Sequence, residues 1–582
     1  MSGGTVTGRG SQGFDFDAVV VGSGFGGAVT ACRLAEAGLA VCVLERGRPY
    51  PPNSFPRSPH AVAKNFWDPS EGLYGMFNPW SFRGLEALVS SGLGGGSLIY
   101  ANVLIRKDER WFVEDDPPGS APRPWPVTRD DLEPHYETAE RMLDAQRYPL
   151  EHPPYDQTRK SLAFRDAAQA LGLDYERPPL AVTFANPGEA PALAKPIPEP
   201  EDRPNLHGEV RTTCRLCGEC DFGCNYGSKN TLDYTYLTAA HHEGADIRTL
   251  CEVRSFAPAD GGYAVDYFEH HPDAAGEESG GPAKTPRRLT ARRLVLSAGA
   301  LSTTYLLLRN RGALPRLGPA LGTRFSGNGD LLSFASRCTE RSNGASRPRR
   351  IDPGRGPVIT SRVRVPDALD GNGVPAGQRG YYLEDAGYPE IVNWLVQSTD
   401  APGTLGRLKG VAHRLLRRHL EREPESDLGA EAAELLGDAV LSDTTLPLLG
   451  MGRDIADGRM RLTGRRGVLD VEWTTETSRE FFEHMRSTAR AIAGAIGGDF
   501  RDNPLWYLRR VITVHPLGGA PMAADPRAGV VDAWGEVHGH PGLYVADGSV
   551  MPGPVGPNPS LTIAALAERF AGRIVERSAG DG

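Results

Sequence analysis

Three glycines and one acidic residue near the amino terminus have the spacing of a dinucleotide site. Gly22, Gly24 and Gly27 form Gly-x-Gly-x-x-Gly, with Gly26 as an additional glycine, and Glu45 follows Gly22 by 23 residues. In this pattern the glycines permit a tight turn, close approach of backbone to a pyrophosphate and close packing of helix on strand. The acid accepts hydrogen bonds from ribose hydroxyls. The stretch is therefore predicted to bind a dinucleotide.

A run of four cysteines is the second feature with chemical meaning. Cys214, Cys217, Cys220 and Cys224 fall within eleven residues, although the whole chain has eight cysteines. Thiolates at this close spacing favour an iron–sulfur cluster, 4Fe–4S or 3Fe–4S, over zinc, which usually takes two separated pairs. Cys224 and Cys251 are alternative fourth ligands, and the fourth ligand could also be absent. Zinc and unmetallated thiols are the alternatives to the cluster.

The third feature is the segment from Thr513 to Ala567, which contains His515-Pro-Leu-Gly-Gly. A single histidine is more often structural, but a position on a turn beside glycines favours a catalytic role. Gly542–Ala546 is predicted to be a strand with Asp547 at its carboxyl end, where parallel sheets bind ligands. A helix from Ser560 would direct its N-terminus, which stabilises negative charge, toward a cofactor ring.

Elements of a parallel sheet surround these residues. Ala18–Val21 and Ala40–Leu44 are apolar runs typical of buried strands, with an Ala/Leu-rich helix between them. Arg293–Ala298, followed by Gly299 and a helix from Ser302, repeats the strand–glycine–helix pattern. The glycines at 94–96 could let the backbone touch a flat cofactor closely.

The pattern changes after Val358. Val358–Val365, Tyr381–Glu384 and Glu390–Gln397 have strand character, and Arg459–Trp473 is predicted to form a hairpin around Gly464–Gly467. These segments predict an antiparallel sheet in a substrate domain. Two charged stretches, His270–Leu289 and Arg337–Gly356, are predicted to be a solvated hairpin tip and a surface loop. Amphipathic helices are predicted for Asp130–Arg141 and Thr158–Leu171. Further helices are predicted for Tyr236–His242 and Arg479–Ile496.

Length, charge and hydropathy limit the function classes. A chain of 582 residues exceeds one ordinary core, so two interlocked domains are expected. A net charge of −9 argues against nucleic acid as a partner. Met1–Gln12 has no apolar signal core, and no stretch is apolar enough to span a membrane, so a cytoplasmic location is predicted. The basic helix predicted at Leu405–Leu420 is interpreted as an ordinary solvated helix, with peripheral membrane contact or a cover over a substrate entrance as alternatives.

Together these motifs resemble the glucose–methanol–choline (GMC) oxidoreductases. The resemblance rests on the glycine turn with Glu45, Gly94–Ser97, Val295–Gly299, His515–Gly519 and Asp547–Thr562. The most similar branch is the cholesterol-oxidase-like one, because Gly94–Asn102 matches its GGGSL-x-YAN motif and Cys214–Leu232 its Cys-rich run.

The resemblance implies non-covalently held FAD and a discontinuous α/β fold. A Rossmann-like FAD-binding domain would comprise residues 14–115, 205–330 and 508–577. An inserted α+β substrate domain built on an antiparallel sheet would comprise 116–204 and 331–507. The implied cofactor-binding residues are Gly22, Gly24, Phe25, Gly26, Gly27, Glu45, Gly94, Gly95, Gly96, Ser97, Asn102, Val253, Ala298, Gly299, Asp547, Gly548, Asn558, Pro559 and Ser560.

The resemblance also implies catalytic roles. His515 would accept the hydroxyl proton, since its ordinary pKa of about 6.5 suits a base near neutral pH. Asn558 would hydrogen-bond the substrate oxygen and hold its carbon against the flavin N5. Glu384 resembles the acid that moves a proton during double-bond migration in steroid-oxidising relatives, with an exposed strand-end Glu as the alternative.

Two functions follow from these residues. The first is oxidation of a bulky apolar alcohol, including a 3-hydroxysteroid such as cholesterol. Its electrons would pass to oxygen or, through the cluster, to a one-electron acceptor. The alternative is a flavin and iron–sulfur protein without redox turnover, either an isomerase or a binding scaffold.

Overall fold

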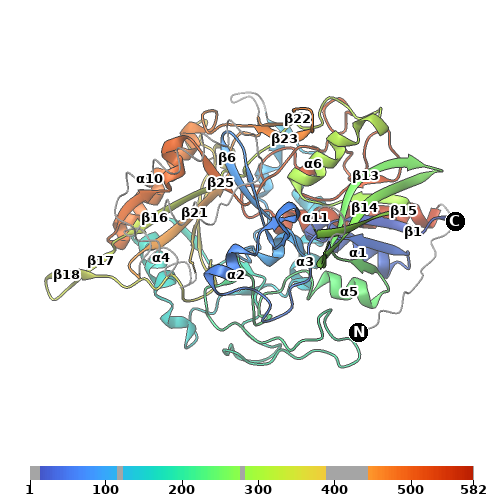
Figure 1. Cartoon of the computed structure of the whole chain (residues 1–582). Helices are drawn as coiled ribbons and strands as arrows, with labels where there is room; N and C mark the ends of the chain where they lie inside the picture. Colours follow the sequence, from blue (N-terminus) through green and yellow to red (C-terminus); the bar gives the residue numbers. More distant parts are fainter. Residues whose placement is uncertain (1–12, 115–121, 276–281, 372, 389–442, 581–582) are drawn as a thin grey trace.

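Two large sheets organise the computed structural model, which describes residues 13–114, 122–275, 282–371, 373–388 and 443–580. The first sheet lies on the right of Figure 1, and the second lies on the left. The chain passes between them several times, so both termini of the described chain belong to the first sheet and its helices. The fold is therefore α/β, with a Rossmann-like domain joined to a domain built on an antiparallel sheet.

The core of the first sheet is parallel. Its strands run in the order β12 (Asp246–Arg248), β2 (Val41–Leu44), β1 (Phe16–Val21), β15 (Pro282–Leu296) and β26 (Leu543–Val545). β1 and β2 are buried on both faces, as their apolar runs predicted. The covering helices include α1 (Phe25–Glu36), α3 (Arg129–Met142), α5 (Tyr236–His242), α6 (Ala300–Arg309) and α11 (Ser560–Gly580). The predicted strand–helix–strand unit at the amino terminus is confirmed.

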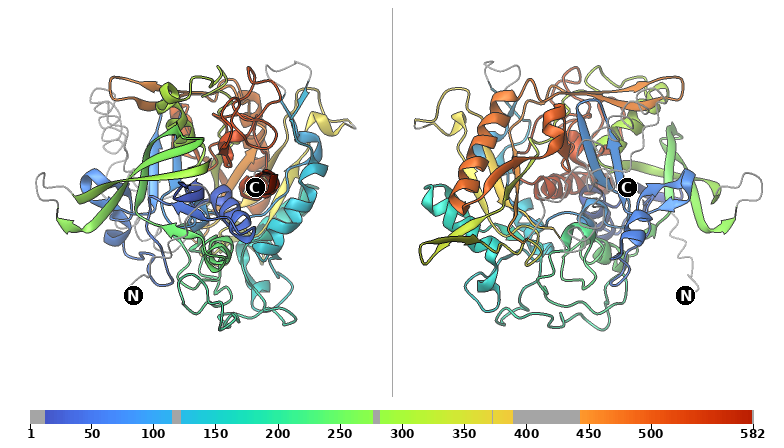
Figure 2. Two further views of the ribbon diagram at one scale, coloured as in Figure 1. Left: turned by 90° about the vertical axis from the view of Figure 1, so that its right-hand side faces the viewer. Right: turned by 60° about the vertical axis from the view of Figure 1, so that its left-hand side comes forward.

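An antiparallel ribbon extends this sheet. β14 (Gly262–Ala275) pairs with β13 (Cys251–Ala259) and with the first part of β15. The ribbon projects from the body of the molecule in the left view of Figure 2. The hairpin predicted at His270–Leu289 is the distal part of this ribbon. Its strand pairing is longer than a tip alone, and cross-strand charge pairs such as Arg288 with Asp266, 2.6 Å apart, accompany it.

The second sheet has six antiparallel strands. Their order is β10 (Asp174–Glu176), β19 (Arg362–Val365), β20 (Tyr381–Asp385), β21 (Leu446–Gly452), β16 (Leu331–Ser336) and β24 (Asp499–Asp502). α10 (Arg479–Ile496) packs on β16 and on α4 (Arg159–Ala170), and its buried residues recur at helical spacing. Both the antiparallel sheet and the helix at 479–496 are confirmed.

Some predicted elements differ from the structure. The hairpin at 459–473 exists as β22 (Arg459–Thr463) and β23 (Val468–Glu472), but it forms its own two-stranded sheet. The predicted surface loop at 337–356 contains the exposed hairpin of β17 (Thr339–Ser342) and β18 (Ala345–Pro348). The predicted strand Glu390–Gln397 and basic helix Leu405–Leu420 lie outside the described residues. Within the described part of the chain, no helix combines the length and apolar character needed to cross a bilayer.

A small three-stranded sheet lies between the two large ones. It contains β5 (Phe77–Ser81), β6 (Leu85–Ser90) and β25 (Val511–Thr513). β25 ends two residues before His515, so this sheet positions the histidine. The shorter elements are α2 (Pro59–Ala63), β3 (Trp67–Asp68), β4 (Leu73–Tyr74), β7 (Val113–Glu114), β8 (Arg123–Pro124), β9 (Gln146–Arg147) and β11 (Pro179–Leu180).

Strand β20 places two neighbouring acids on opposite faces of the antiparallel sheet, since side chains alternate along a strand. Asp385 points toward α4, where its carboxylate lies 2.8 Å from the Lys160 ammonium and both side chains are fully buried. The hydroxyl of Thr360 and the backbone N–H of Ser361 also donate to Asp385. The ion pair therefore ties helix and sheet together in the substrate domain.

Replacing Lys160 with methionine should destabilise this domain strongly. The variant leaves the Asp385 carboxylate buried without its counter-ion, which typically costs about 3–5 kcal/mol. The measurement is the midpoint of urea denaturation. Arg165→Met on the same helix is the control, because Arg165 forms an exposed pair with Asp166 and should shift the midpoint little. Equal effects of the two substitutions would contradict a structural role for the buried pair.

Candidate active site

A large cavity, of about 1010 Å³, is lined by residues of both sheets. Its walls come from the glycine turns of the first sheet, from the segment after β25 and from one face of the antiparallel sheet. The volume is at the upper end of the usual range for small-molecule sites. The cavity joins residues from the beginning, middle and end of the chain.

The amino-terminal glycine turn forms one end of the cavity. Gly22 has a φ of +95°, and Gly24 is the N-cap of α1, whose first turn has no acidic residue. A Cβ on Gly26 would lie 1.3 Å from the Ala546 carbonyl oxygen, and one on Gly95 would lie 2.7 Å from the Gly24 Cα. The backbone of the glycine turn is thus in direct contact with the backbone at Ala546 and at Gly95. The N–H groups at the start of α1 remain available to an anion. This cradle fits the diphosphate of a dinucleotide.

Glu45 lies on the same wall at the end of β2. One of its carboxylate oxygens accepts the Ser23 N–H at 3.0 Å and the Ser23 hydroxyl at 2.7 Å. The other accepts the Gly47 N–H at 2.8 Å. These bonds fix the carboxylate at the position where the sequence predicts contact with ribose.

Asp547 connects two strand ends at the cavity. Its carboxylate accepts the Gly299 N–H at 2.9 Å and the Thr303 hydroxyl at 2.5 Å. The hydroxyl and N–H of Ser549 donate to the other oxygen. Burial raises the pKa of Asp547, while these donors favour its ionised form.

Most predicted cofactor residues lie on the cavity wall. They are Gly22, Gly24, Phe25, Gly26, Glu45, Gly95, Gly96, Val253, Ala298, Gly299, Asp547, Gly548, Asn558, Pro559 and Ser560.

Four others, Gly27, Gly94, Ser97 and Asn102, do not line the cavity and support the turns from behind. Gly27 packs against the Gly22 carbonyl, where an added Cβ would lie 2.0 Å from the oxygen. The Ser97 hydroxyl donates to the Gly94 carbonyl at 2.7 Å. Asn102 has a φ of +70° and is fully buried. For these four, direct contact with the cofactor stays a prediction.

His515 reaches the cavity from the turn after β25 and is paired with Asp330. Its Nδ1 lies 2.8 Å from one oxygen of Asp330, whose side chain is 1% exposed. The other oxygen accepts the Thr513 hydroxyl at 3.0 Å and the Val514 N–H at 2.9 Å. Because a carboxylate can only accept, Nδ1 carries the proton in this pair. Nε2 is then the nitrogen that can accept a proton from a ligand.

Asp330 was missed in the sequence. It follows the turn Gly327-Asn328-Gly329, in which Asn328 and Gly329 have positive φ values, and it immediately precedes β16. The signal available in the sequence was the Gly-Asn-Gly turn, because asparagine and glycine readily adopt the positive φ angles of a sharp turn. Such a turn lies just before the strand. Nothing in the sequence connects it with His515, which is 185 residues away.

Asn558 on the cavity wall contacts Glu384, which lies behind it and is not one of the residues that line the cavity. The Asn558 amide nitrogen lies 3.4 Å from one Glu384 oxygen, and Glu384 is fully buried rather than exposed at a strand end. The second Glu384 oxygen and the Asn558 carbonyl oxygen have no hydrogen-bond partner in the described structure. Burial raises the pKa of Glu384 to about 8, against a smaller opposing effect of the Asn558 hydrogen bond.

The wall around this pair is apolar. Leu449 on β21 stands opposite both Glu384 on β20 and Leu332 on β16, so the three share one face of the sheet. Leu332, Leu449 and Phe334 line the cavity. The chamber beside Glu384 therefore suits an apolar molecule.

The four-cysteine run does not form a metal site in the structure. In the described ranges, no three His, Cys, Asp or Glu side chains are placed to share a metal ion. Cys214 packs in an apolar cluster with Tyr148 and Tyr155, and burial raises the pKa of the Cys214, Cys217 and Cys220 thiols. The predicted iron–sulfur ligation by Cys214, Cys217, Cys220 and Cys224 therefore has no support from the described structure, in which these residues form a loop of thiols.

Protein contacts hold this loop in place of a metal. Arg57 pairs with Glu219 at 2.7 Å and donates to the Gly223 carbonyl at 2.5 Å. Cys217 forms a β-bridge with Gly356. Cys251, the alternative fourth ligand, lies instead at the start of β13, where its N–H donates to the Glu45 carbonyl at 2.8 Å.

Comparison with known proteins gives consistent matches. The family described as GMC oxidoreductase matches residues 205–325 and 455–567, and an NAD(P)-binding Rossmann-like domain matches residues 20–49. A cholesterol oxidase of Mycobacterium tuberculosis is 30% identical, with 96% of this chain and 90% of that protein covered. A cholesterol oxidase of Acinetobacter baumannii is 28% identical, with 96% and 94% covered.

A solved structure supports the fold. An FAD-dependent oxidoreductase from Chaetomium thermophilum superposes with a TM-score of 0.57 at 15% identity, covering 97% of this chain and all of that one. At this identity the likeness extends to the arrangement of the two sheets and does not identify a substrate.

Proposed function

This chain belongs to the GMC oxidoreductase family, whose members act on alcohols with FAD, and we propose that it oxidises a bulky apolar secondary alcohol with His515 as the base. The observation that supports this most directly is the His515–Asp330 pair at the wall of the cavity that contains the glycine cradle. Asp330 orients the ring and leaves Nε2 as the proton acceptor.

The chain's residues divide the chemistry between them. Nε2 of His515 takes the hydroxyl proton as the alcohol carbon becomes a carbonyl carbon. The Asn558 amide, anchored against Glu384, is placed to hydrogen-bond the substrate oxygen and orient its carbon. The cofactor that fits the cradle, FAD, would supply a two-electron acceptor for the hydride released from that carbon. The apolar side chains of the chamber disfavour water near the transfer.

The proposed substrate is a 3-hydroxysteroid such as cholesterol. Two observations support this substrate class. The relatives described above include cholesterol oxidases at 30% and 28% identity. The chamber is lined by large apolar side chains, which favour a rigid hydrocarbon over a sugar. Molecular oxygen is the proposed electron acceptor, in keeping with the names of these relatives.

Glu384 is proposed to act in a second step, the migration of a double bond toward the new carbonyl group. This step needs a carboxylate that removes a proton from one carbon and returns it to another. Glu384 stands opposite Leu449 and contacts Asn558, and both of these residues line the cavity. Burial raises the pKa of its carboxyl group to about 8. Its unpartnered oxygen is free for that exchange within the described structure.

Replacing His515 with alanine should leave FAD bound and slow flavin bleaching by cholesterol in the absence of air about 10²- to 10⁴-fold, because the base is lost. Stopped-flow absorbance measures the rate. His241→Ala, at an exposed position on α5, is the control and should bleach normally. Full activity of the His515 variant would exclude this base. Absence of bleaching of the unmodified protein with any alcohol would instead favour a role without redox turnover.

Replacing Asp330 with asparagine should reduce kcat for oxidation by about 10²-fold or more, because an amide no longer fixes the ring tautomer. KM should change little, since the substrate does not bind through Asp330. Thr513→Val, which removes one donor to the same carboxylate, should cost much less. A rise in KM at unchanged kcat would argue against positioning of His515.

The rate of double-bond migration should depend on Glu384 ionisation. With a pKa of about 8, Glu384 is protonated at lower pH and becomes a base as the pH rises through this value. The rate should therefore increase about tenfold per pH unit below pH 8 and level off above it. Absorbance of the conjugated ketone measures this step. Glu384→Gln should abolish migration and retain oxidation, and a pH-independent rate would contradict this role.

A further inference from the structure

Asp221 presents a carboxylate to the cavity at a position that none of the steps above uses. It lies on the short 3₁₀ turn Cys220–Phe222 of the cysteine loop and lines the cavity together with Tyr100 and Val358. One of its oxygens is buried and accepts no hydrogen bond in the part of the chain that the structure describes. A buried acceptor without a donor is unfavourable, so native structures seldom retain one without a reason.

Apolar side chains contribute to the cavity that Asp221 lines. Val103, Val358 and Ile359 are among the lining residues, and their side chains cannot hydrogen-bond. A ligand that fills the chamber would therefore remove the remaining water from the carboxylate. Such a ligand binds well only if it brings its own donor.

Two lysines offset part of the charge of Asp221, although burial still raises its pKa to about 6. Lys229 and Lys160 are the two cations that act on it electrostatically. Lys160 is engaged with Asp385 at 2.8 Å. Lys229 donates to the Leu98 and Cys220 carbonyl oxygens at 3.1 and 2.8 Å. Both of these partners are neutral, so they leave the positive charge of Lys229 in place. What Asp221 lacks is a hydrogen-bond donor, not a counter-ion.

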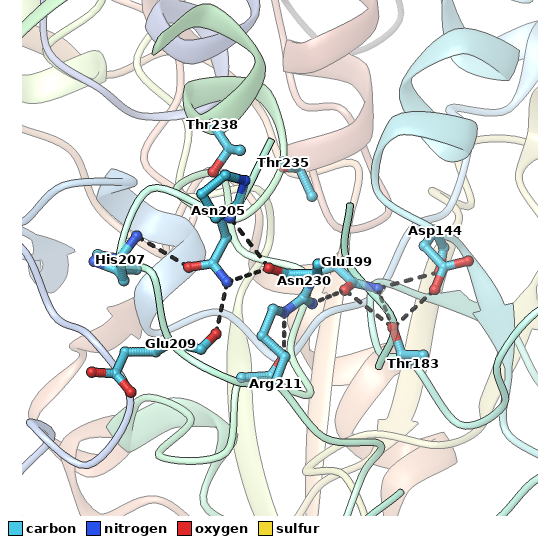
Figure 3. Close-up of polar contacts among 12 residues, drawn as sticks. Asp144, Thr183, Glu199, Asn205, His207, Glu209, Arg211, Asn230, Thr235 and Thr238 are labelled. Carbon is cyan, nitrogen blue, oxygen red and sulfur yellow. Dashed lines mark hydrogen bonds and ion pairs between the residues drawn. The ribbon is translucent and has the colours of Figure 1, made fainter. Parts of the chain in front are cut away.

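The surrounding loops hold Asp221 and Lys229 in fixed positions. Arg57 binds the cysteine loop from one side. On the other side, Asn230 accepts a hydrogen bond from Arg211 and donates one to the Thr183 hydroxyl, which in turn donates to Asp144 at 2.9 Å (Figure 3). The polar network anchors the segment next to Lys229. The carboxylate is thus part of a built wall.

We propose that Asp221 accepts a hydrogen bond from a second, uncharged hydroxyl group of the alcohol substrate, at a distance from the carbon that is oxidised beside His515. The inference rests on the proposed function. It selects, among the bulky apolar alcohols and 3-hydroxysteroids proposed above, those with a second hydroxyl group, which cholesterol itself lacks. Asp221 is a specificity residue in this scheme and takes no part in proton transfer.

Matched probes of increasing length test this inference. They are 1-alkanols, α,ω-alkanediols and ω-amino-1-alkanols of about six to twelve carbons, which sample different separations between the two groups. Dissociation constants come from flavin difference spectra of the FAD-loaded His515→Ala protein, in which turnover should not interfere. Flavin bleaching by the same probes in the unmodified protein is measured separately.

At one chain length or more, the diol should bind about tenfold tighter than the 1-alkanol, as expected for a hydrogen bond to a charged group. Asp221→Leu should reduce this preference to less than about twofold, and Asp221→Asn, which retains a carbonyl acceptor, should keep part of it. Glu219→Gln on the same loop is the matched control and should keep the whole preference, because Glu219 faces Arg57.

Three results would overturn the inference. One is the absence of any diol preference across the series, or its survival in Asp221→Leu. Another is tighter binding of the amino alcohol than of the diol, which would mean that Asp221 prefers a cationic group of the ligand to an uncharged hydroxyl group. The third is loss of FAD or an altered flavin spectrum in both Asp221 variants, which would assign the carboxylate to the cofactor. If no alcohol bleaches the flavin, the proposed function fails, while the binding ratios still decide this inference.

Discussion

Close contact between backbone segments at the glycine turns is the constraint on which the rest of the structure depends. Gly26 lies so near the Ala546 carbonyl that no Cβ fits, and Gly95 is pressed against Gly24 in the same way. Three segments far apart in sequence are therefore held at one point. The carboxyl-terminal strand and the turn at 92–97 can form walls of the same cavity only because these positions lack side chains.

Strand alternation determines what the second sheet contributes to that cavity. On β20, Asp385 faces α4 and forms a buried ion pair, whereas Glu384 lies on the opposite face, across from Leu449, which lines the cavity. A slip of one residue would exchange the two acids, placing the ion-paired carboxylate in the chamber and Glu384 against Lys160. The buried pair thus supports the register that presents Glu384, and structure and proposed chemistry rest on the same strand pairing.

The sequence predicted the elements whose signals are local. The strand–glycine–helix unit with Glu45, the helix at 479–496 and the turn of His515 all follow from short-range patterns, and the structure contains them. Asp330 could not be identified because its partner His515 is distant in sequence and only the fold brings them together. The cysteine spacing has a related limit as a signal. Spacing indicates that four thiols could bind one metal site, but it does not show whether the folded chain directs them toward a common point. Here Arg57 and the bridge to Gly356 fix the loop without a metal.

The buried carboxylates also differ in how completely the protein satisfies them. Asp385 receives Lys160, a hydroxyl and backbone N–H groups, and Asp330 receives His515, a hydroxyl and a backbone N–H. Glu384 and Asp221 each keep an oxygen with no donor among the residues that the structure describes. The first two acids are fixed because the fold or the base requires a single orientation. Since an unmet acceptor is costly wherever it is buried, the other two are best explained by a molecule that enters the chamber and supplies what the protein omits.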